Sequence, residues 1–392
     1  MTPSTLEARW LRADQARLDD LQALQALRTD PAMCPRAVQV LAQVPVYDCQ
    51  TLRAALARDP AERAALMAEW AAVWEDGPGI LVLQRAFADT AVVDAVTACF
   101  NRLIEQERAN RSGADHFAQA GANDRVWNAL EKLCLLDPGA FAHYYANDMI
   151  ALASEAWLGP GYQITSQVNN VRPGGAAQRA HRDYHLGFCT AAQAERYPAH
   201  VHRLSPMLTL QGAVAHVDMP LESGPTLYLP HSQKFRHGHL IAGRAEFQAF
   251  FDAQCVQLPL ARGDAVFFNP ALLHAAGHNR SATIQRMANL LQVSSAMGRA
   301  MESVDRDRMV RALYPQLLTL KGQPGWDPAS LARVVAASAE GYAFPTNLDR
   351  DPPLGGLAPA SMQTVLLRAF DEHWPAGRLD AQLCAMARNR LS

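Results

Sequence analysis

The feature that most constrains the fold is a His-x-Asp motif, His181-Arg182-Asp183, with a second histidine, His274, far downstream. Side chains two residues apart on an extended chain point to the same face and lie roughly 7 Å apart along the backbone. A β-strand at the motif would therefore present His181 and Asp183 together to one metal ion. If His274 supplies a third ligand, the ion must connect strands that are distant in sequence.

His274 follows the predicted apolar strand Ala265–Phe268, at a point where the apolar run has ended. Two histidines and one carboxylate on one side of an ion leave other positions open, as is typical of non-haem Fe(II). The competing His278 lies beyond a glycine in a polar turn, where we expect it to be solvated or hydrogen-bonded. A second His-x-Asp triplet, His216-Val217-Asp218, precedes a turn, and we expect its aspartate to organise that loop.

Arg286 opens the predicted strand Arg286–Val293, which is otherwise mostly apolar. Burying an unpaired charge is very costly, so this guanidinium needs a partner. The distal carboxylate of 2-oxoglutarate is a natural bidentate partner, and an internal ion pair is the alternative. Arg280, in the preceding turn, is the weaker candidate. The order His-x-Asp, distal His, Arg therefore suggests an oxygenase that uses Fe(II), 2-oxoglutarate and O2.

Three regions differ in their hydrophobic pattern. Residues 1–77 are predicted to form a helical extension, with a candidate capping box at Ser4–Glu7 and a helix that begins at Asp59-Pro60. Residues 78–300 are rich in short strands, and residues 301–392 return to a helical pattern around a proline-rich loop at 342–353. Short strands between Pro/Gly turns, with ligands at strand ends, predict a jelly roll; the strands expected are Ile80–Leu83, Ile164–Val171, Met207–His216, Thr226–Leu229, Cys255–Leu258, Ala265–Phe268 and Arg286–Val293.

Composition excludes several classes of protein. Of the 392 residues, 49% are hydrophobic, which is ample for a large core, and the net charge of −2 gives no electrostatic case for nucleic acid or an anionic membrane. The seven cysteines include no C-x-x-C and predict reduced thiols in a cytoplasmic protein. A polar N-terminus and the lack of a long apolar window argue against a signal peptide or a membrane span.

With these residues assembled, the chain resembles the phytanoyl-CoA dioxygenase family of Fe(II)/2-oxoglutarate oxygenases over roughly residues 78–300. The resemblance is carried by His181-x-Asp183, by Gly224–Ser232, and by the segment from Gly263-Asp264 through Asn279 and Ser281 to Arg286. It implies an α+β fold in which a double-stranded β-helix core is flanked by N- and C-terminal helical regions. It also implies iron ligands His181, Asp183 and His274, with Arg286 holding 2-oxoglutarate.

The chain departs from the family pattern in two places. Pro230-His231-Ser232-Gln233 stands where the family often has Pro-Gly-Ser-His, and the interval between His274 and Arg286 is one residue longer than usual. Related halogenases carry a small residue where this chain has Asp183. The carboxylate therefore favours hydroxylation or another outcome of hydrogen abstraction. The expected reaction is hydroxylation of an unactivated C–H of a small-molecule metabolite, with release of succinate and CO2.

Gln167 and Asn169, at alternate positions of the strand before the motif, are expected to line the cofactor-binding pocket with Tyr184 and Tyr228. Ordinary filling of a jelly roll is the alternative for each of them. Two other functions stay open: a cupin-type metal oxygenase that does not use 2-oxoglutarate, and a non-catalytic binding protein that retains the fold. The expected partner is a small-molecule substrate, and the helical regions leave room for a homo-oligomer contact.

Overall fold

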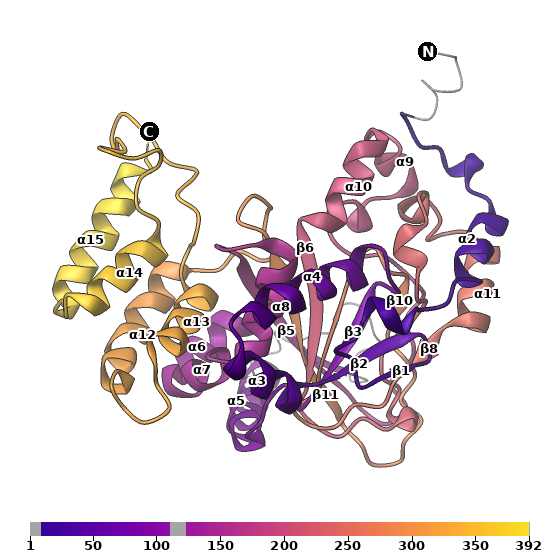
Figure 1. Cartoon of the computed structure of the whole chain (residues 1–392), viewed down its shortest axis with the longest axis horizontal. Coiled ribbons are helices and arrows are strands. Elements are labelled where there is room, and N and C mark those ends of the chain that lie inside the picture. Colours follow the sequence, from indigo (N-terminus) through magenta and orange to yellow (C-terminus); the bar gives the residue numbers. More distant parts are fainter. Residues whose placement is uncertain (1–8, 110–122, 392) are drawn as a thin grey trace.

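The computed structural model describes residues 9–109 and 123–391, and it contains two β-sheets surrounded by helices (Figure 1). The larger sheet has eight strands in the order β1-β2-β3-β9-β6-β11-β5-β4, and the smaller has the order β10-β7-β8. The strands are β1 (Gln39–Leu41), β2 (Val44–Asp48), β3 (Ile80–Gln84), β4 (Asn123–Val126), β5 (Gln163–Val171), β6 (Thr209–Ala215), β7 (Leu227–Tyr228), β8 (Val256–Gln257), β9 (Ala265–Phe268), β10 (His274–Ala275) and β11 (Arg286–Ser294).

In Figure 1, α12 to α15 lie on the left, on the opposite side of the larger sheet from α2 and α11, and α4 and α8 lie between these two groups. They are α2 (Leu18–Gln25), α3 (Cys49–Arg58), α4 (Ala61–Glu75), α5 (Thr90–Ala109), α6 (Ala129–Leu136), α7 (Pro138–Tyr145), α8 (Asp148–Leu158), α9 (Ala191–Ala194), α10 (Ala199–Met207), α11 (Ala245–Gln254), α12 (Arg306–Leu320), α13 (Pro328–Ser338), α14 (Met362–Asp371) and α15 (Ala376–Asn389). Within the described residues, no helix combines the length and apolar character that crossing a membrane requires. All seven cysteines are free thiols.

The mixed class of helices and strands is confirmed, and each predicted strand forms with small shifts at its ends. In the larger sheet β11 pairs antiparallel with β5 from Arg286↔Val171 to Ser294↔Gln163, and with β6 on its other side. Met207, predicted as strand, instead ends α10, and β6 begins at Thr209.

The expectation that residues 1–77 are helical is wrong for β1 and β2. β2 pairs in parallel with β3 and so extends the larger sheet. Its valines Val44 and Val46 and the ring of Tyr47 are buried, which is the behaviour of β-branched and aromatic residues on a packed strand. Residues 44–48 form a strand because they pair with β3. A segment of five residues is too short to show a clear hydrophobic period in the sequence. The proposed capping box at Ser4–Glu7 lies outside the described residues.

Alternation along the strands gives the larger sheet two different faces. One face packs on the helices: Ile164, Val168 and Leu291 share a core with Trp74 of α4 and with apolar residues of α12 to α15. The other face, which carries Gln167, Asn169 and Gln292, lines a cavity. Because side chains alternate with a period of two, the same strands serve the core and the cavity.

We expect Trp74→Ala to lower the free energy of unfolding by about 3–5 kcal/mol. Trp74 is fully buried, packs edge-on against Trp157 and donates its Nε1–H to the carbonyl of Phe267 at 3.1 Å. Urea denaturation measures the change. Leu357→Ala, at a fully exposed side chain, is the matched control and should leave stability unchanged. Equal stability of the two variants would contradict the packing described.

Candidate metal centre

Backbone pairing brings the two histidines together. His181 donates its N–H to the carbonyl of His274 at 3.0 Å, and His274 donates back to His181 at 3.1 Å. The bridge is isolated, so the strand predicted at the motif does not form around it. The reason lies at Tyr184, whose φ of 63° turns the chain away immediately after Asp183. Two further backbone hydrogen bonds, from the N–H of Gln178 to the carbonyl of Ala276 and from that of Asp183 to the carbonyl of Pro270, help to set the distance between the segments.

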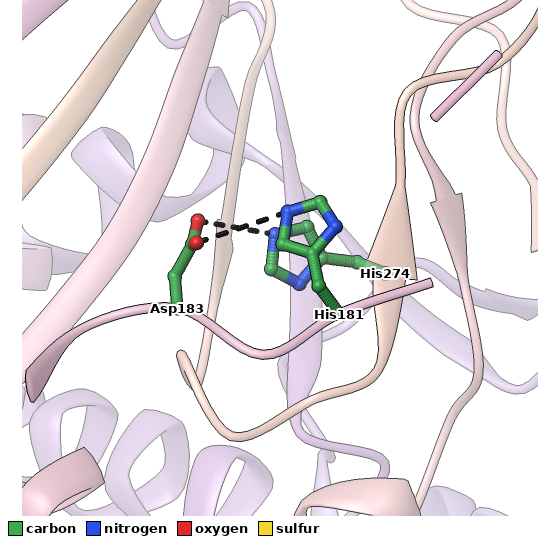
Figure 2. Close-up of side chains that lie close together, drawn as sticks. All are labelled: His181, Asp183 and His274. Carbon is green, nitrogen blue, oxygen red and sulfur yellow. Dashed lines mark ion pairs between the residues drawn. The ribbon is translucent and has the colours of Figure 1, made fainter. Parts of the chain in front are cut away.

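The side chains of His181, Asp183 and His274 converge on one point (Figure 2). Their ligand atoms lie within 4.8 Å of one another, and the two imidazole centroids are 4.6 Å apart. Nε2 of His181 is 3.7 Å from Oδ1 of Asp183, and Nε2 of His274 is 3.4 Å from Oδ2. Two donors that are each about 2.1 Å from an ion lie at most about 4.2 Å apart, so the two nitrogen–oxygen separations fit one ion.

Hydrogen bonds on the far side of each ring fix its orientation. Nδ1 of His181 donates to the carbonyl of Arg179 at 2.8 Å, and Nδ1 of His274 donates to that of Leu272 at 2.9 Å. With the proton held on Nδ1, the lone pair of each Nε2 faces Asp183 and is available to a metal.

The electrostatics of the site keep these groups in the protonation state that metal binding needs. Burial alone would raise the pKa of Asp183, but the neighbouring His274 and His181 and the Gln211 amide, which donates at 2.5 Å, hold it far below its usual range. Burial, followed by the neighbouring His274, lowers the pKa of His181. At neutral pH the aspartate is therefore ionised and His181 is neutral.

The three side chains open into a cavity of about 570 Å³, within the usual range for small-molecule sites. Gln167, Asn169 and Tyr228, which were expected to line a pocket, all line this cavity. Tyr184 does not belong to its wall: the ring is buried elsewhere.

Arg286 lines the same cavity and is 6% exposed. Its Nη1 donates to the carbonyls of Ser223 and Gly277, both at 3.3 Å. Among the residues that the structure describes, no carboxylate lies within ion-pair distance of this guanidinium. Burial lowers its pKa to about 10, so it is still a cation at neutral pH. Arg280, the alternative candidate, is exposed and lies outside the cavity wall.

The second His-x-Asp triplet serves internal packing. His216 is buried, with Nδ1 2.8 Å from the hydroxyl of Thr97 and Nε2 3.0 Å from that of Tyr144. Asp218 accepts the backbone N–H of Arg262 in a neighbouring turn. Burial lowers the pKa of His216 to about 3. His278 is exposed and takes no part in either cluster.

Several residues of the cavity wall have no counterpart in the sequence predictions; they are Arg125, Trp127, Gln211, Gln292 and Met301. The sequence gives a weak indication that the two glutamines line a cavity, since each is a polar residue within a mostly apolar strand. It gives no such indication for Arg125, because the short strand β4 was not predicted. Asn279, part of the segment that carries the family resemblance, donates from Nδ2 to the carbonyls of Val171 and Ile284 and so closes the turn before β11.

Comparison with known proteins identifies the family. The profile of the phytanoyl-CoA dioxygenase family (PhyH) matches residues 76–288, more than half of the chain. The chain belongs to this family, as the resemblance of its motifs predicted. No curated protein matches the sequence.

Solved structures with a similar arrangement include three enzymes of low sequence identity. The non-heme alpha ketoglutarate dependent epimerase SnoN from nogalamycin biosynthesis is 21% identical over 61% of this chain and 85% of its own, with a TM-score of 0.42. The carbocyclase SnoK from the same biosynthesis is 18% identical over 62% and 89%, with a TM-score of 0.43. HygX from Streptomyces hygroscopicus, with nickel and 2-oxoglutarate bound, is 15% identical over 59% and 88%, with a TM-score of 0.42.

We expect His181→Ala and Asp183→Ala to lose metal binding while the protein stays folded. Each change removes one of three converging donors, and neither side chain belongs to an apolar core cluster. Iron content after anaerobic loading with Fe(II), together with circular dichroism, measures both properties. His278→Ala, at an exposed histidine, should load like the unchanged protein. Full iron content in both site variants would remove the proposed centre.

Stability should fall as the pH drops below 6.5, partly through His216. The unfolded chain binds a proton at this imidazole below its ordinary pKa of 6.5, whereas the folded protein does so only near 3. The unfolded state thus holds more protons in that window, and acidification favours it. Urea denaturation at several pH values measures the free energy of unfolding. On acidification this free energy should fall less for His216→Gln than for the unchanged protein, and should fall equally for the exposed control His278→Gln. The same pH dependence in His216→Gln and in the unchanged protein would contradict this account.

Proposed function

We propose that this protein is an Fe(II)- and 2-oxoglutarate-dependent oxygenase, with His181, Asp183 and His274 as the iron ligands. The observation that carries the proposal is that three converging donors share one cavity with a buried arginine that has no described carboxylate partner. Membership of the phytanoyl-CoA dioxygenase family supports it. We also propose that the two sheets form the double-stranded β-helix of that family, with the ligands at one end.

The donor set fits a ferrous ion. Two imidazoles and one carboxylate, all on one side, are the set that leaves positions open for a 2-oxo acid and O2. When bound, Fe(II) and 2-oxoglutarate supply the oxidising chemistry, with release of succinate and CO2. The carbonyls of Arg179 and Leu272 hold the imidazoles in the required orientation, and the Gln211 amide holds the carboxylate.

Arg286 is the proposed anchor for the distal carboxylate of 2-oxoglutarate. A guanidinium presents two parallel N–H groups that match a carboxylate, and burial strengthens the attraction because little water competes. The carbonyls of Ser223 and Gly277 hold Nη1 in place before the co-substrate arrives. This preorganisation reduces the entropy lost on binding.

Hydroxylation of a C–H bond in a small molecule is the proposed outcome. Asp183 retains the carboxylate that occupies a coordination position, which argues against halide binding there. SnoN is described as an epimerase and SnoK as a carbocyclase, so product analysis is the direct test of the reaction type.

The free thiols support a reducing, cytoplasmic location.

A cupin-type oxygenase is the second candidate, but it gives Arg286 no evident purpose. Anaerobic addition of Fe(II) and then 2-oxoglutarate discriminates the two, since a 2-oxo acid bound to Fe(II) gives a visible charge-transfer band. Absence of the band in iron-loaded protein would reject the 2-oxoglutarate proposal.

We expect Arg286→Gln to raise the 2-oxoglutarate concentration needed for half-maximal succinate release by roughly 10- to 100-fold, as for loss of a charge-assisted hydrogen bond. Titration of the charge-transfer band measures the same affinity without turnover. Arg280→Gln is the matched control, because that side chain is exposed outside the cavity. If Arg280→Gln raised the requirement and Arg286→Gln did not, the anchor would lie in the turn.

A further inference from the structure

The middle residue of the His-x-Asp motif, Arg182, binds a loop behind the candidate metal centre. On an extended chain, the side chain between two that share a face lies on the opposite face. Arg182 is 5% exposed, and its Nη2 donates to the carbonyl of Ser232 at 2.6 Å and to that of Phe235 at 2.9 Å. Both acceptor residues lie outside the cavity wall. The guanidinium therefore ties the segment that carries His181 and Asp183 to the loop that follows β7.

Ser232 connects the same loop to the third ligand. It is fully buried, and its Oγ accepts the backbone N–H of Leu273, the residue before His274, at 2.8 Å. The carbonyl of Leu273 in turn accepts the N–H of Leu229 at 2.9 Å. Ser232 thus binds the motif through its carbonyl and the His274 segment through its hydroxyl.

The loop at residues 229–235 is itself fastened to the segment that follows α4. Gln233 donates from Nε2 to the carbonyl of Gly77 at 2.9 Å, and the N–H of His231 donates to the carbonyl of Pro78 at 2.9 Å. Gln233 stands where the family pattern often has a histidine, so this departure coincides with a contact that holds the loop. A loop held on its far side is a firm support for the two segments that bind it.

Gly238 makes room for the guanidinium of Arg182. A Cβ at this position would lie 1.8 Å from Cζ of Arg182, far inside van der Waals contact. A methyl group there must either displace the guanidinium from the carbonyls of Ser232 and Phe235 or move the loop that carries them. Either movement breaks the contact, so Gly238→Ala displaces the guanidinium without removing its charge from the protein.

We propose that Arg182 and Ser232 form a positioning bridge that holds the two ligand-bearing segments at the separation that one metal ion needs. Arg182 is a positioning residue, because its guanidinium acts on the metal only through His181 and Asp183. The backbone bonds between His181 and His274 place the segments side by side, and the bridge connects them a second time from behind. This inference rests on the proposed function, because it takes these three side chains as the ligands.

The test uses the full chain, loaded anaerobically with Fe(II) or, as a spectroscopic probe, with Co(II). The variants are Arg182→Met, Arg182→Lys, Ser232→Ala and Gly238→Ala. Leu313→Ala, at a fully buried side chain of α12 in the main core, is the control for lost stability alone. Competition with a chelator measures metal affinity, and the visible spectrum of the Co(II) form reports the ligand geometry. Urea denaturation of the metal-free protein measures the free energy of unfolding.

We expect Arg182→Met, Ser232→Ala and Gly238→Ala each to lower metal affinity by roughly 10- to 100-fold, as for other groups that orient metal ligands, and to change the Co(II) spectrum. Arg182→Lys should recover part of the affinity, because a single nitrogen makes both bonds to the loop. The double variant of Arg182→Met and Ser232→Ala should lose less than the product of the two single losses, since both break one bridge. Leu313→Ala should lose stability and keep both the affinity and the spectrum.

The proposal would be overturned if Arg182→Met and Gly238→Ala lost stability but kept full metal affinity and an unchanged Co(II) spectrum, because Arg182 would then serve the fold alone. If Arg182→Met does not fold, Gly238→Ala and Ser232→Ala decide the question by the same two measurements. An unchanged protein that binds neither metal would instead reject the proposed metal centre itself. The two failures are therefore distinguishable in one titration series.

Discussion

The reciprocal backbone hydrogen bonds between His181 and His274 are the constraint on which the rest of the site depends. They join a segment that follows β5 to one that follows β9, and they fix the distance between two imidazoles whose residues are far apart in sequence. Asp183 reaches the same point only because the chain is still extended there and turns afterwards, at Tyr184. The pair is supported from both sides: the N–H of Gln178 donates to the carbonyl of Ala276, that of Asp183 donates to the carbonyl of Pro270, and β10 pairs with β7.

Burial gives the side chains of this site their chemical character. Asp183 would be hard to ionise in the interior without the two imidazoles and the Gln211 amide, and His181 is kept neutral by burial and by its neighbour. The result is an ionised Asp183 and a neutral His181, the forms that bind a divalent ion. The buried cation Arg286, held by two carbonyls and no described carboxylate, makes the same cavity receptive to a dianionic co-substrate.

The larger sheet separates two tasks by strand alternation. On one face β5, β6 and β11 pack against helices, including the C-terminal ones, and form the main core. On the other face the same strands carry Gln167, Gln211 and Gln292 into the cavity. A polar residue on the inner face does not disturb the apolar packing against the helices. Because the cavity wall and the core are two faces of one sheet, the packing of the core also fixes the positions of the side chains that line the cavity.

The sequence alone determined the strand-rich middle of the chain, the three donors and Arg286, because each depends on local spacing and on residue chemistry. The tertiary structure alone decided which residues join them. β2 is a strand because β3 pairs with it, the motif forms an isolated bridge because the chain turns at Tyr184, and Arg125 reaches the cavity because β4 is registered against Asn169. Cross-strand neighbours are set by register between distant segments, and register leaves no periodic signal within a single segment.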